Sequence, residues 1–463
     1  MNRPIRSWLM DSAVSALLMA LASQFALGQP QESPAELAAR IDKLIQQLDD
    51  DQFAAREKAE AELAAIGQPA TARLLEATKD ASAERRLRAD KVLQAIKRAG
   101  LGLRHVGTLT HPMLAGAVTL VISPDGQFVY VPAFQVSAVS VFHRDAATGA
   151  LEHRQSIADP GQLGGIVSLR LSADGKFGVG AAFSSKSIAL FSRNAETGEL
   201  KLEGVRRHEP EGAVKFEWPI DAAFSPDGKF VYAVDDRAAT VVVFQVEDGK
   251  RLNLVQTFAG EERCFDGARG IVSSPDGKTM YVNSRRPGTL AVLDRDPATG
   301  KLAVRQLLRD EQDGIHGLAG TTGAIASRDG QFVYSISGRF EGDNAVGVYQ
   351  VRADGKLSLL EEFVNDERGL KNFTGPNDLT ISPDGQHLYA SGTTSCSVAC
   401  FQRDAGSGRL SLVATLQNEA TGLGSELGAN GLDVSPDGRF FYLTLENGSA
   451  ISIFERTVKP APR

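Results

Sequence analysis

Charged and amide side chains recur in this chain at fixed distances from a repeated turn, whose sequence is Ser-Pro-Asp-Gly or close to it. Counted from the Asp of each turn, position −7 is Arg or Asn in three units, position −6 is Asp in two, and position +9 is Arg in one. The residues are Asp221, Arg269, Arg285, Asn377, Asp378 and Asn430. Guanidinium groups bind carboxylate and phosphate oxygens, whereas Asn and Asp oxygens bind hydroxyl groups or a cation. The set predicts a site for a small anionic or sugar-like ligand, or for a loop of a partner protein.

The same residue types also have an ordinary structural use, because Asn and Asp begin turns and charged residues cover surfaces. Neighbouring loops add further charges, among them Asp236, Arg339 and Glu446, and for the last two we favour plain surface charge. The seven His are scattered without the spacing of a zinc site. No glycine-rich phosphate loop is present in the sequence.

The elements that must position these residues form repeats. The turn Asp stands at 125, 174, 227, 276, 329, 384 and 437, in steps of 49 to 55 residues. Such a period predicts a β-propeller. The first unit reads as four strands at 118–122, 128–131, 139–142 and 151–157, so the fold class is an all-β propeller of seven blades. Sites gather on loops that a rigid scaffold holds, and the candidate residues are expected at one channel mouth.

The last unit has only three strands before the chain ends, while residues 103–110 form a strand that belongs to no unit. We expect this early strand to complete the seventh blade, because an unpaired sheet edge would otherwise remain. The propeller domain therefore spans 101–463.

Residues 29–100 form a separate, all-α module. Ala, Glu, Leu and Arg dominate, and helices are expected from Pro34, over 53–66, over 70–78 and over 83–99. The helix pairs resemble a HEAT-like repeat pair, which implies a protein-docking module. A cap or spacer is the alternative that we favour, because no constrained catalytic residue types occur there.

Residues 1–28 have the features of a secretory signal peptide: basic Arg3 and Arg6, a short apolar run, and small residues before a cut at Gln29. A membrane anchor is the alternative, but the run is short for a span. The expected protein is secreted or periplasmic and monomeric, with no membrane span after cleavage. The net charge of −7 argues against a nucleic-acid partner.

The repeat text Ser-Pro-Asp-Gly-Lys-Phe-Val-Tyr, with a later Val-Phe-Gln, resembles the lactonase-type propellers, which include cycloisomerase-type 6-phosphogluconolactonases and YVTN-repeat proteins. The resemblance covers about residues 103–456 and implies hydrolysis of a sugar lactone by a His, an Arg and a Glu. At those positions this chain has Asp221, Arg269 and Arg285, so only the Arg is kept. We expect Asp221 and Arg269 to form an ion pair. The leading interpretation is a binding or scaffold protein, and the alternative is a lactonase.

Two strand starts, Gly375-Pro-Asn-Asp and Asn430-Gly-Leu-Asp, are similar to the Asn-bearing strands of calcium-dependent gluconolactonases. That resemblance implies Ca²⁺ held by Asn377 and Asn430. Apart from this calcium ion, the sequence predicts no cofactor.

Overall fold

The computed structural model describes residues 34–100, 103–260, 263–339, 342–417 and 428–456. The chain divides into two compact units, Met1–Ile96 and Lys97–Arg463. The predicted signal peptide lies outside the described residues. Within the described part of the chain, no helix is long and apolar enough to cross a membrane.

The helical unit packs its helices around an aliphatic core that includes Leu48, Leu63, Leu74 and Leu93. Its elements are α2 (Pro34–Gln46), η1 (Gln47–Asp49), α3 (Phe53–Ile66), η2 (Gln68–Ala70), α4 (Thr71–Ala77) and α5 (Ala83–Gly100). The bounds agree to within one residue with the predicted ones for every helix whose two ends were predicted. The HEAT-like character of the unit stays a prediction.

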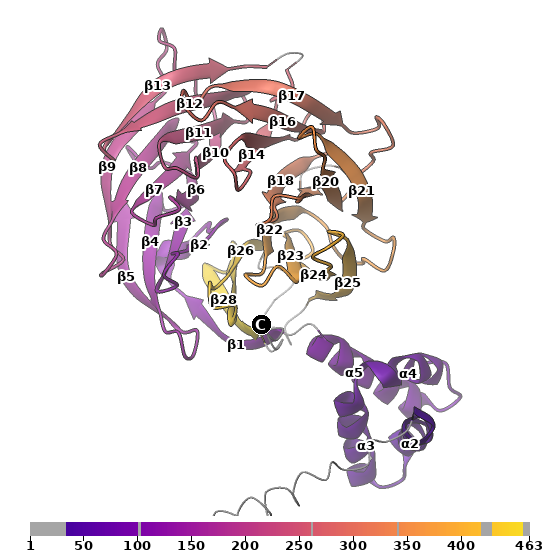
Figure 1. Ribbon diagram of the computed structural model, residues 1–463. Coiled ribbons are helices and arrows are strands. Elements are labelled where there is room, and N and C mark those ends of the chain that lie inside the picture. Colours follow the sequence, from indigo (N-terminus) through magenta and orange to yellow (C-terminus); the bar gives the residue numbers. More distant parts are fainter. Residues whose placement is uncertain (1–33, 101–102, 261–262, 340–341, 418–427, 457–463) are drawn as a thin grey trace, which may run out of the picture. The chain divides into compact units, whose positions relative to one another are not determined.

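The second unit is a seven-bladed β-propeller, as predicted, with each blade a four-stranded antiparallel sheet (Figure 1). Blade 1 contains β2 (Val121–Ile122), β3 (Phe128–Ala133), β4 (Ala138–Arg144) and β5 (Leu151–Ala158). Blade 2 contains β6 (Ile166–Leu171), β7 (Phe177–Ala182), β8 (Ser187–Arg193) and β9 (Leu200–Arg207). Blade 3 contains β10 (Pro219–Phe224), β11 (Phe230–Asp235), β12 (Thr240–Glu247) and β13 (Arg251–Phe258). Blade 4 contains β14 (Ala268–Ser273), β15 (Thr279–Ser284), β16 (Thr289–Arg295) and β17 (Leu302–Arg309).

The remaining blades follow the same order. Blade 5 contains β18 (Thr321–Ala326), β19 (Phe332–Ser337), β20 (Ala345–Val351) and β21 (Leu357–Val364). Blade 6 contains β22 (Pro376–Ile381), β23 (His387–Gly392), β24 (Ser397–Arg403) and β25 (Leu410–Leu416). Blade 7 contains β26 (Ala429–Val434), β27 (Phe440–Leu445), β28 (Ala450–Arg456) and β1 (Leu103–Thr110).

The ring closes as the sequence predicted. Strand β1 pairs antiparallel with β28, from Leu103 opposite Arg456 to Thr110 opposite Ala450. Because β1 comes from the start of the propeller unit, the seventh sheet joins the two ends of the ring.

The first strand of blade 1 is shorter than expected, since β2 covers only Val121–Ile122 and not 118–122. The backbone at Thr119 lies against Gly431 of blade 7, where a Cβ atom would be 2.3 Å from the Thr119 Cα. Beyond Thr119, Ala117 forms an isolated bridge with Ala133 of β3.

An arginine at the end of the third strand joins many of the blades to the blade before it. In blade 2, Arg193 Nε donates to the hydroxyl of Tyr130 (2.5 Å), and Nη2 donates to the turn carboxylate of Asp125 (2.6 Å), both in blade 1. Its Nη1 donates to the carbonyl of Gly175 in its own turn (3.2 Å). The same three partners recur around Arg144, Arg295, Arg403 and Arg456.

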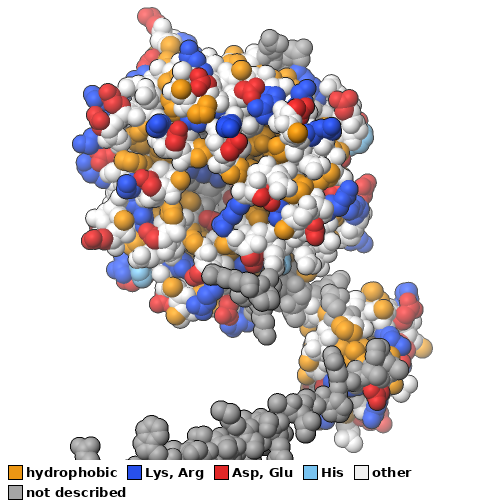
Figure 2. Space-filling view, in the orientation of Figure 1, with side chains coloured by type: hydrophobic (Ala, Val, Ile, Leu, Met, Phe, Trp, Pro, Cys, Tyr) orange, Lys and Arg blue, Asp and Glu red, His pale blue; other side chains and the backbone are white. Residues whose placement is uncertain are grey.

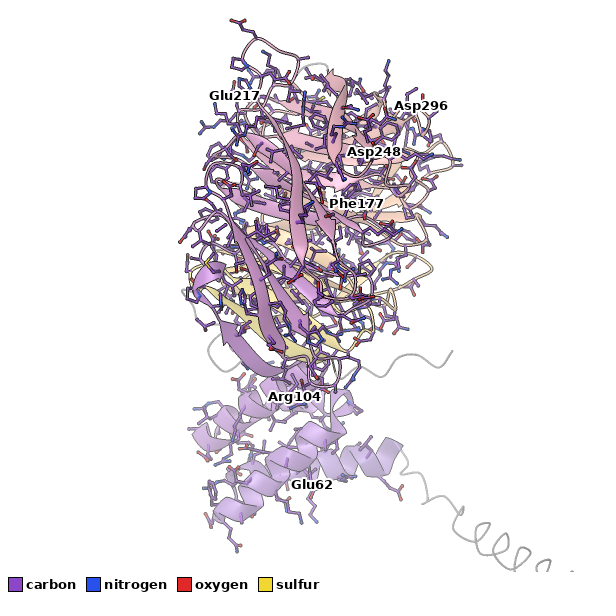
Figure 3. The ribbon with its side chains drawn as sticks, turned by 90° about the vertical axis from the view of Figure 1, so that its left-hand side faces the viewer. Glu62, Arg104, Phe177, Glu217, Asp248 and Asp296 are labelled. Carbon is purple, nitrogen blue, oxygen red and sulfur yellow. The ribbon has the colours of Figure 1, made fainter. Side chains whose placement is uncertain are left out.

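Blades 3 and 5 have Val246 and Val351 at this position, identified by their shared backbone hydrogen bond. The blade 2–blade 3 joint keeps an aromatic contact that joints with the arginine also have. Phe177 of β7 lies beside the hairpin of Asp248 and Gly249 (Figure 3), so closely that a Cβ on Gly249 would be 2.3 Å from the Phe177 ring.

We expect Arg193→Val to lower the free energy of unfolding by about 2–4 kcal/mol, because the buried Tyr130 hydroxyl and the partly exposed Asp125 carboxylate lose their charged partner. Arg154→Ala is the control, since Arg154 forms only an exposed ion pair with Glu152 and should change the free energy by less than about 0.5 kcal/mol. Equilibrium denaturant unfolding measures both. An Arg193→Val protein as stable as the control would contradict this account of the joints.

Candidate functional site

A cavity of about 420 Å³ occupies the channel, with lining residues from every blade. The space-filling view shows the propeller hollowed at its centre (Figure 2). A smaller cavity of about 170 Å³ shares Thr119, Ser168, Arg170 and Asp378 with the larger one. The candidate site is therefore a recess that continues along the channel.

One backbone hydrogen bond, repeated in all seven blades, positions the rim of the cavity. The N–H at position +9 from the turn Asp donates to the carbonyl at position −9, over 2.9 to 3.2 Å. The donors are Phe134, Phe183, Asp236, Arg285, Gly338, Thr393 and Glu446. Five of them line the cavity, namely Phe134, Phe183, Asp236, Arg285 and Glu446. Position +9 from the turn Asp thus supplies much of the rim of the cavity.

The acceptor at position −9 is a glycine with positive φ in six blades: Gly116, Gly165, Gly267, Gly320, Gly375 and Gly428. A Cβ on Gly116 or Gly165 would lie within about 3 Å of the aromatic ring at position +9 of its own blade. In blade 3 the acceptor is Trp218. Blade 3 therefore has a large aromatic side chain at position −9, where the other six blades have glycine.

Three arginines surround Asp236 on one wall of the cavity. Arg285 Nε donates to its carboxylate (3.0 Å), Arg286 Nη2 donates to it (2.7 Å), and Arg269 Nη1 lies 3.5 Å away. Burial alone would raise the pKa of Asp236, whose side chain is 2% exposed, but the Arg285 hydrogen bond and the three positive charges hold it below its usual value. Arg286 Nη1 also donates to Asp266 (2.7 Å), so the cluster has three guanidinium groups and two carboxylates and is positively charged.

The same burial acts on Arg269 in the opposite sense. Together with the charges of Arg339 and Arg285, it lowers the pKa of Arg269 to about 10, against the attraction of Asp236. Burial disfavours the charged form of Arg269, and an anion bound beside it would stabilise that form.

The expected Asp221–Arg269 ion pair is replaced by two other pairs. Asp221 lies 3.4 Å from Arg170 Nη2, and Arg269 pairs with Asp236. Arg170, which was not predicted as a site residue, stands at position −4 and therefore deeper along its strand. Asp221 is 4% exposed, and its Oδ1 makes no hydrogen bond with any described residue.

Arg339 and Glu446, which we assigned to plain surface charge, belong to the site. Arg339 Nη1 donates to the Asn377 Oδ1 and to the Asn430 Oδ1 (3.0 Å), and its Nη2 lies 3.5 Å from Glu446. Asn430 also donates to Glu446. The side chains of Arg339 and Glu446 are only 16% and 18% exposed, because both line the cavity.

These contacts do not fit calcium at Asn377 and Asn430. Both amide oxygens accept from a guanidinium group, whose positive charge would repel a divalent cation at the same place. Among the described residues, no group of three or more His, Cys, Asp or Glu side chains is arranged to hold a metal ion.

Asp378 and Asp433 lie along the inner part of the channel. Burial raises the pKa of Asp378 to about 7, in spite of the Arg170 charge and the N–H groups of Leu432 and Leu379. Burial likewise raises the pKa of Asp433 to about 6. Asp378 lines both cavities, so it is a group that can exchange a proton near neutral pH in contact with a ligand.

Aromatic side chains line the cavity in blades 1 to 3. The rings of Phe134 and Phe183 are 6.2 Å apart, and those of Phe183 and Trp218 are 5.5 Å apart. The Arg237 guanidinium lies 3.9 Å from the Trp218 ring centroid. The sequence argument did not find these three rings, although position +9 would have given two of them.

The structure brings the six candidate residues together. Asp221, Arg269, Arg285, Asn377 and Asp378 line the cavity. Asn430 borders it through its hydrogen bonds with Arg339 and Glu446.

The sequence matches the family described as "Lactonase, 7-bladed beta-propeller" over residues 105–216 and 169–423, which is well over half of the chain. The chain therefore belongs to the lactonase family of seven-bladed β-propellers. It is 26% identical over 195 residues to a 6-phosphogluconolactonase of Bacillus subtilis, a match that covers 42% of this chain and 52% of the relative. The chain thus spans about half the length of the curated relatives it matches.

Solved structures share the fold. A periplasmic gluconolactonase of Pseudomonas aeruginosa matches with a TM-score of 0.54 at 24% identity, over 67% of this chain and 86% of that one. Hydrazine synthase of Kuenenia stuttgartiensis matches with a TM-score of 0.55 at 19% identity, over 76% of this chain and 98% of that one. Because proteins so different in name match equally well, the fold does not decide the activity.

The raised pKa of Asp378 predicts a pH-dependent stability. Between about pH 4 and 7 the folded protein keeps a proton that the unfolded chain has lost, so the free energy of unfolding falls as the pH rises through this window. Asp378→Asn removes the buried charge. We expect the variant to gain about 2 kcal/mol over the wild type at pH 8 and to match it near pH 4.

Denaturant unfolding at the two pH values measures this difference. Asp248→Asn is the control, because the Asp248 side chain is 78% exposed. An Asp378→Asn effect that is the same at both pH values would contradict the assignment.

Proposed function

We propose that this protein hydrolyses a lactone that carries an anionic group, in the channel cavity. One observation supports this above the others: Asp378, with a pKa of about 7, lines the same cavity as Arg269, Arg285 and Arg339. A carboxylate of this pKa suits a general base at neutral pH, and the arginines suit an anionic substrate. Membership of the lactonase family and the 6-phosphogluconolactonase relative agree with the proposal.

In this mechanism the Asp378 carboxylate takes a proton from a water molecule, whose oxygen attacks the lactone carbonyl carbon. The carbonyl oxygen becomes an oxyanion, which Arg269 stabilises from its buried position. The ring C–O bond then breaks, and the leaving alkoxide takes the proton from Asp378. Arg285 and Arg339 bind the anionic substituent of the substrate. The product is the hydroxy acid, and Asp378 is returned to its ionised form.

A binding protein without turnover is the second candidate. Two of the three positions that the family resemblance gives to catalysis carry Asp221 and Arg285, and a guanidinium group cannot act as a base. Such a protein would use the same arginines to hold an anionic ligand.

For the compartment we propose export to the periplasm or beyond. The predicted signal peptide at residues 1–28 supports this, together with the periplasmic gluconolactonase among the structural neighbours.

We expect the protein to hydrolyse lactones and so to release acid. The test is a panel of phosphorylated, carboxylated and neutral lactones, with the released acid titrated at constant pH. We expect the anionic lactones to be preferred and kcat to fall as the pH drops through about 7, where Asp378 becomes protonated. Arg269→Ala should lower kcat/KM by about 10²–10³-fold, and Asp378→Asn should abolish turnover.

Arg154→Ala, an exposed arginine of blade 1, is the control and should leave turnover unchanged. No turnover of any lactone, with thermal stabilisation by anionic ligands, would favour the binding protein. Turnover that survives both Arg269→Ala and Asp378→Asn would contradict the assignment of this site.

A further inference from the structure

The aromatic rings that line the cavity come from blades 1 to 3, and three of its four lining arginines, Arg269, Arg285 and Arg339, come from blades 4 and 5. In blades 1 to 3, position −7 is Val118, Val167 or Ile220, and all three line the cavity. From blade 4 onward the same position is Arg269, Thr322, Asn377 or Asn430. Position +9 is Phe134 and Phe183 in blades 1 and 2, Arg285 and Glu446 in blades 4 and 7, and the buried Asp236 in blade 3. Arg170 and Asp221 also line the cavity in blades 2 and 3.

The rings of blades 1 to 3 form a continuous aromatic surface. Phe134, Phe183 and Trp218 come from three successive blades, with neighbouring ring centroids 6.2 and 5.5 Å apart. We call these three rings the aromatic wall. These tilted rings, beside Val118 and Val167, offer hydrocarbon contact to a ligand.

Blade 3 builds its part of this wall by a departure from the repeat. Trp218 occupies the place of the glycine that accepts the position +9 hydrogen bond in the six other blades. The Asp235 carboxylate holds the surrounding backbone, accepting the N–H groups of Glu217 and Trp218 (both 2.8 Å) and of Arg237 (2.9 Å). Arg237 then covers the Trp218 ring at 3.9 Å. A buried carboxylate thus fixes both the ring and its cationic cover.

We propose that the aromatic wall is a specificity subsite, which selects ligands with an aryl or other flat hydrocarbon group next to their anionic group. This rests on the site named under the proposed function and narrows its substrate class. The arginines bind the anion, while the flat hydrocarbon group packs on Phe183 and Trp218. A ligand with hydroxyl groups on every carbon would bury some of them against these side chains without a hydrogen-bond partner, which disfavours it.

The test uses two ligands with the same phosphate group, phenyl phosphate and glucose 6-phosphate. Trp8 and Trp218 are the two tryptophans of the chain, so in a Trp8→Phe protein the intrinsic fluorescence reports on the aromatic wall. We expect phenyl phosphate to quench this fluorescence and to bind at least tenfold more tightly than glucose 6-phosphate.

Phe183→Ala in the same protein should weaken phenyl phosphate at least tenfold and glucose 6-phosphate less than twofold, whereas Arg285→Ala should weaken both ligands alike. Phe183→Leu is the second variant, because it keeps apolar volume and should lose less of the preference than Phe183→Ala. Isothermal titration calorimetry gives the affinities independently of fluorescence.

The inference is overturned if glucose 6-phosphate binds as tightly as phenyl phosphate, or if Phe183→Ala weakens both ligands equally. A strong preference for phenyl phosphate in a protein that turns over no lactone would support the subsite and refute the hydrolase. Lactone turnover without a preference for phenyl phosphate would support the hydrolase and refute the subsite.

Discussion

The structure depends on an arginine that binds the preceding blade. At five of the seven joints it donates to a tyrosine hydroxyl and pairs with the turn aspartate of the neighbour, while it also holds the glycine carbonyl of its own turn. The Ser-Pro-Asp-Gly turn therefore shapes a hairpin and also supplies the charge that fixes the next blade. Arg144 extends this to the seam, because its partners Tyr442 and Asp437 belong to blade 7. A propeller closed at every joint can hold side chains in its channel at constant positions.

In this rigid frame the backbone at the rim of the site is the same in each blade, and the side chains differ. The bond from position +9 to position −9 is the same in every blade, so each blade offers an equivalent place for one side chain at the rim. Blades 1 and 2 place Phe there, blade 3 adds Trp218 at the acceptor position, and blade 4 places Arg285. The resulting cavity is lined by aromatic rings from blades 1 to 3 and by arginines from blades 4 and 5, and Asp378, whose pKa burial raises, lines both this cavity and the smaller one.

The fold could be predicted well from the sequence alone because the same turn and strand pattern occurs seven times in it. The seven turns, the blade order and closure by residues 103–110 follow from spacing, and the structure agrees. Side-chain pairing was harder to predict. Asp221 and Arg269 stand at adjacent offsets in adjacent blades, yet each has another partner, Arg170 and Asp236. Arg339 and Glu446 seemed to be surface charges because a sequence does not show that their loops turn toward the channel. The aromatic wall was missed because single Phe and Trp residues in loops look like ordinary core.

We propose that one cavity binds the anionic part of a ligand through its arginines and the flat hydrocarbon part on the aromatic wall. A crystal structure of the protein with bound phenyl phosphate tests this most directly. The account predicts phosphate oxygens within hydrogen-bond distance of Arg269, Arg285 or Arg339, with the phenyl ring against Phe183 and Trp218. Phenyl phosphate bound outside the channel, or with its phosphate on the aromatic side, would contradict the account.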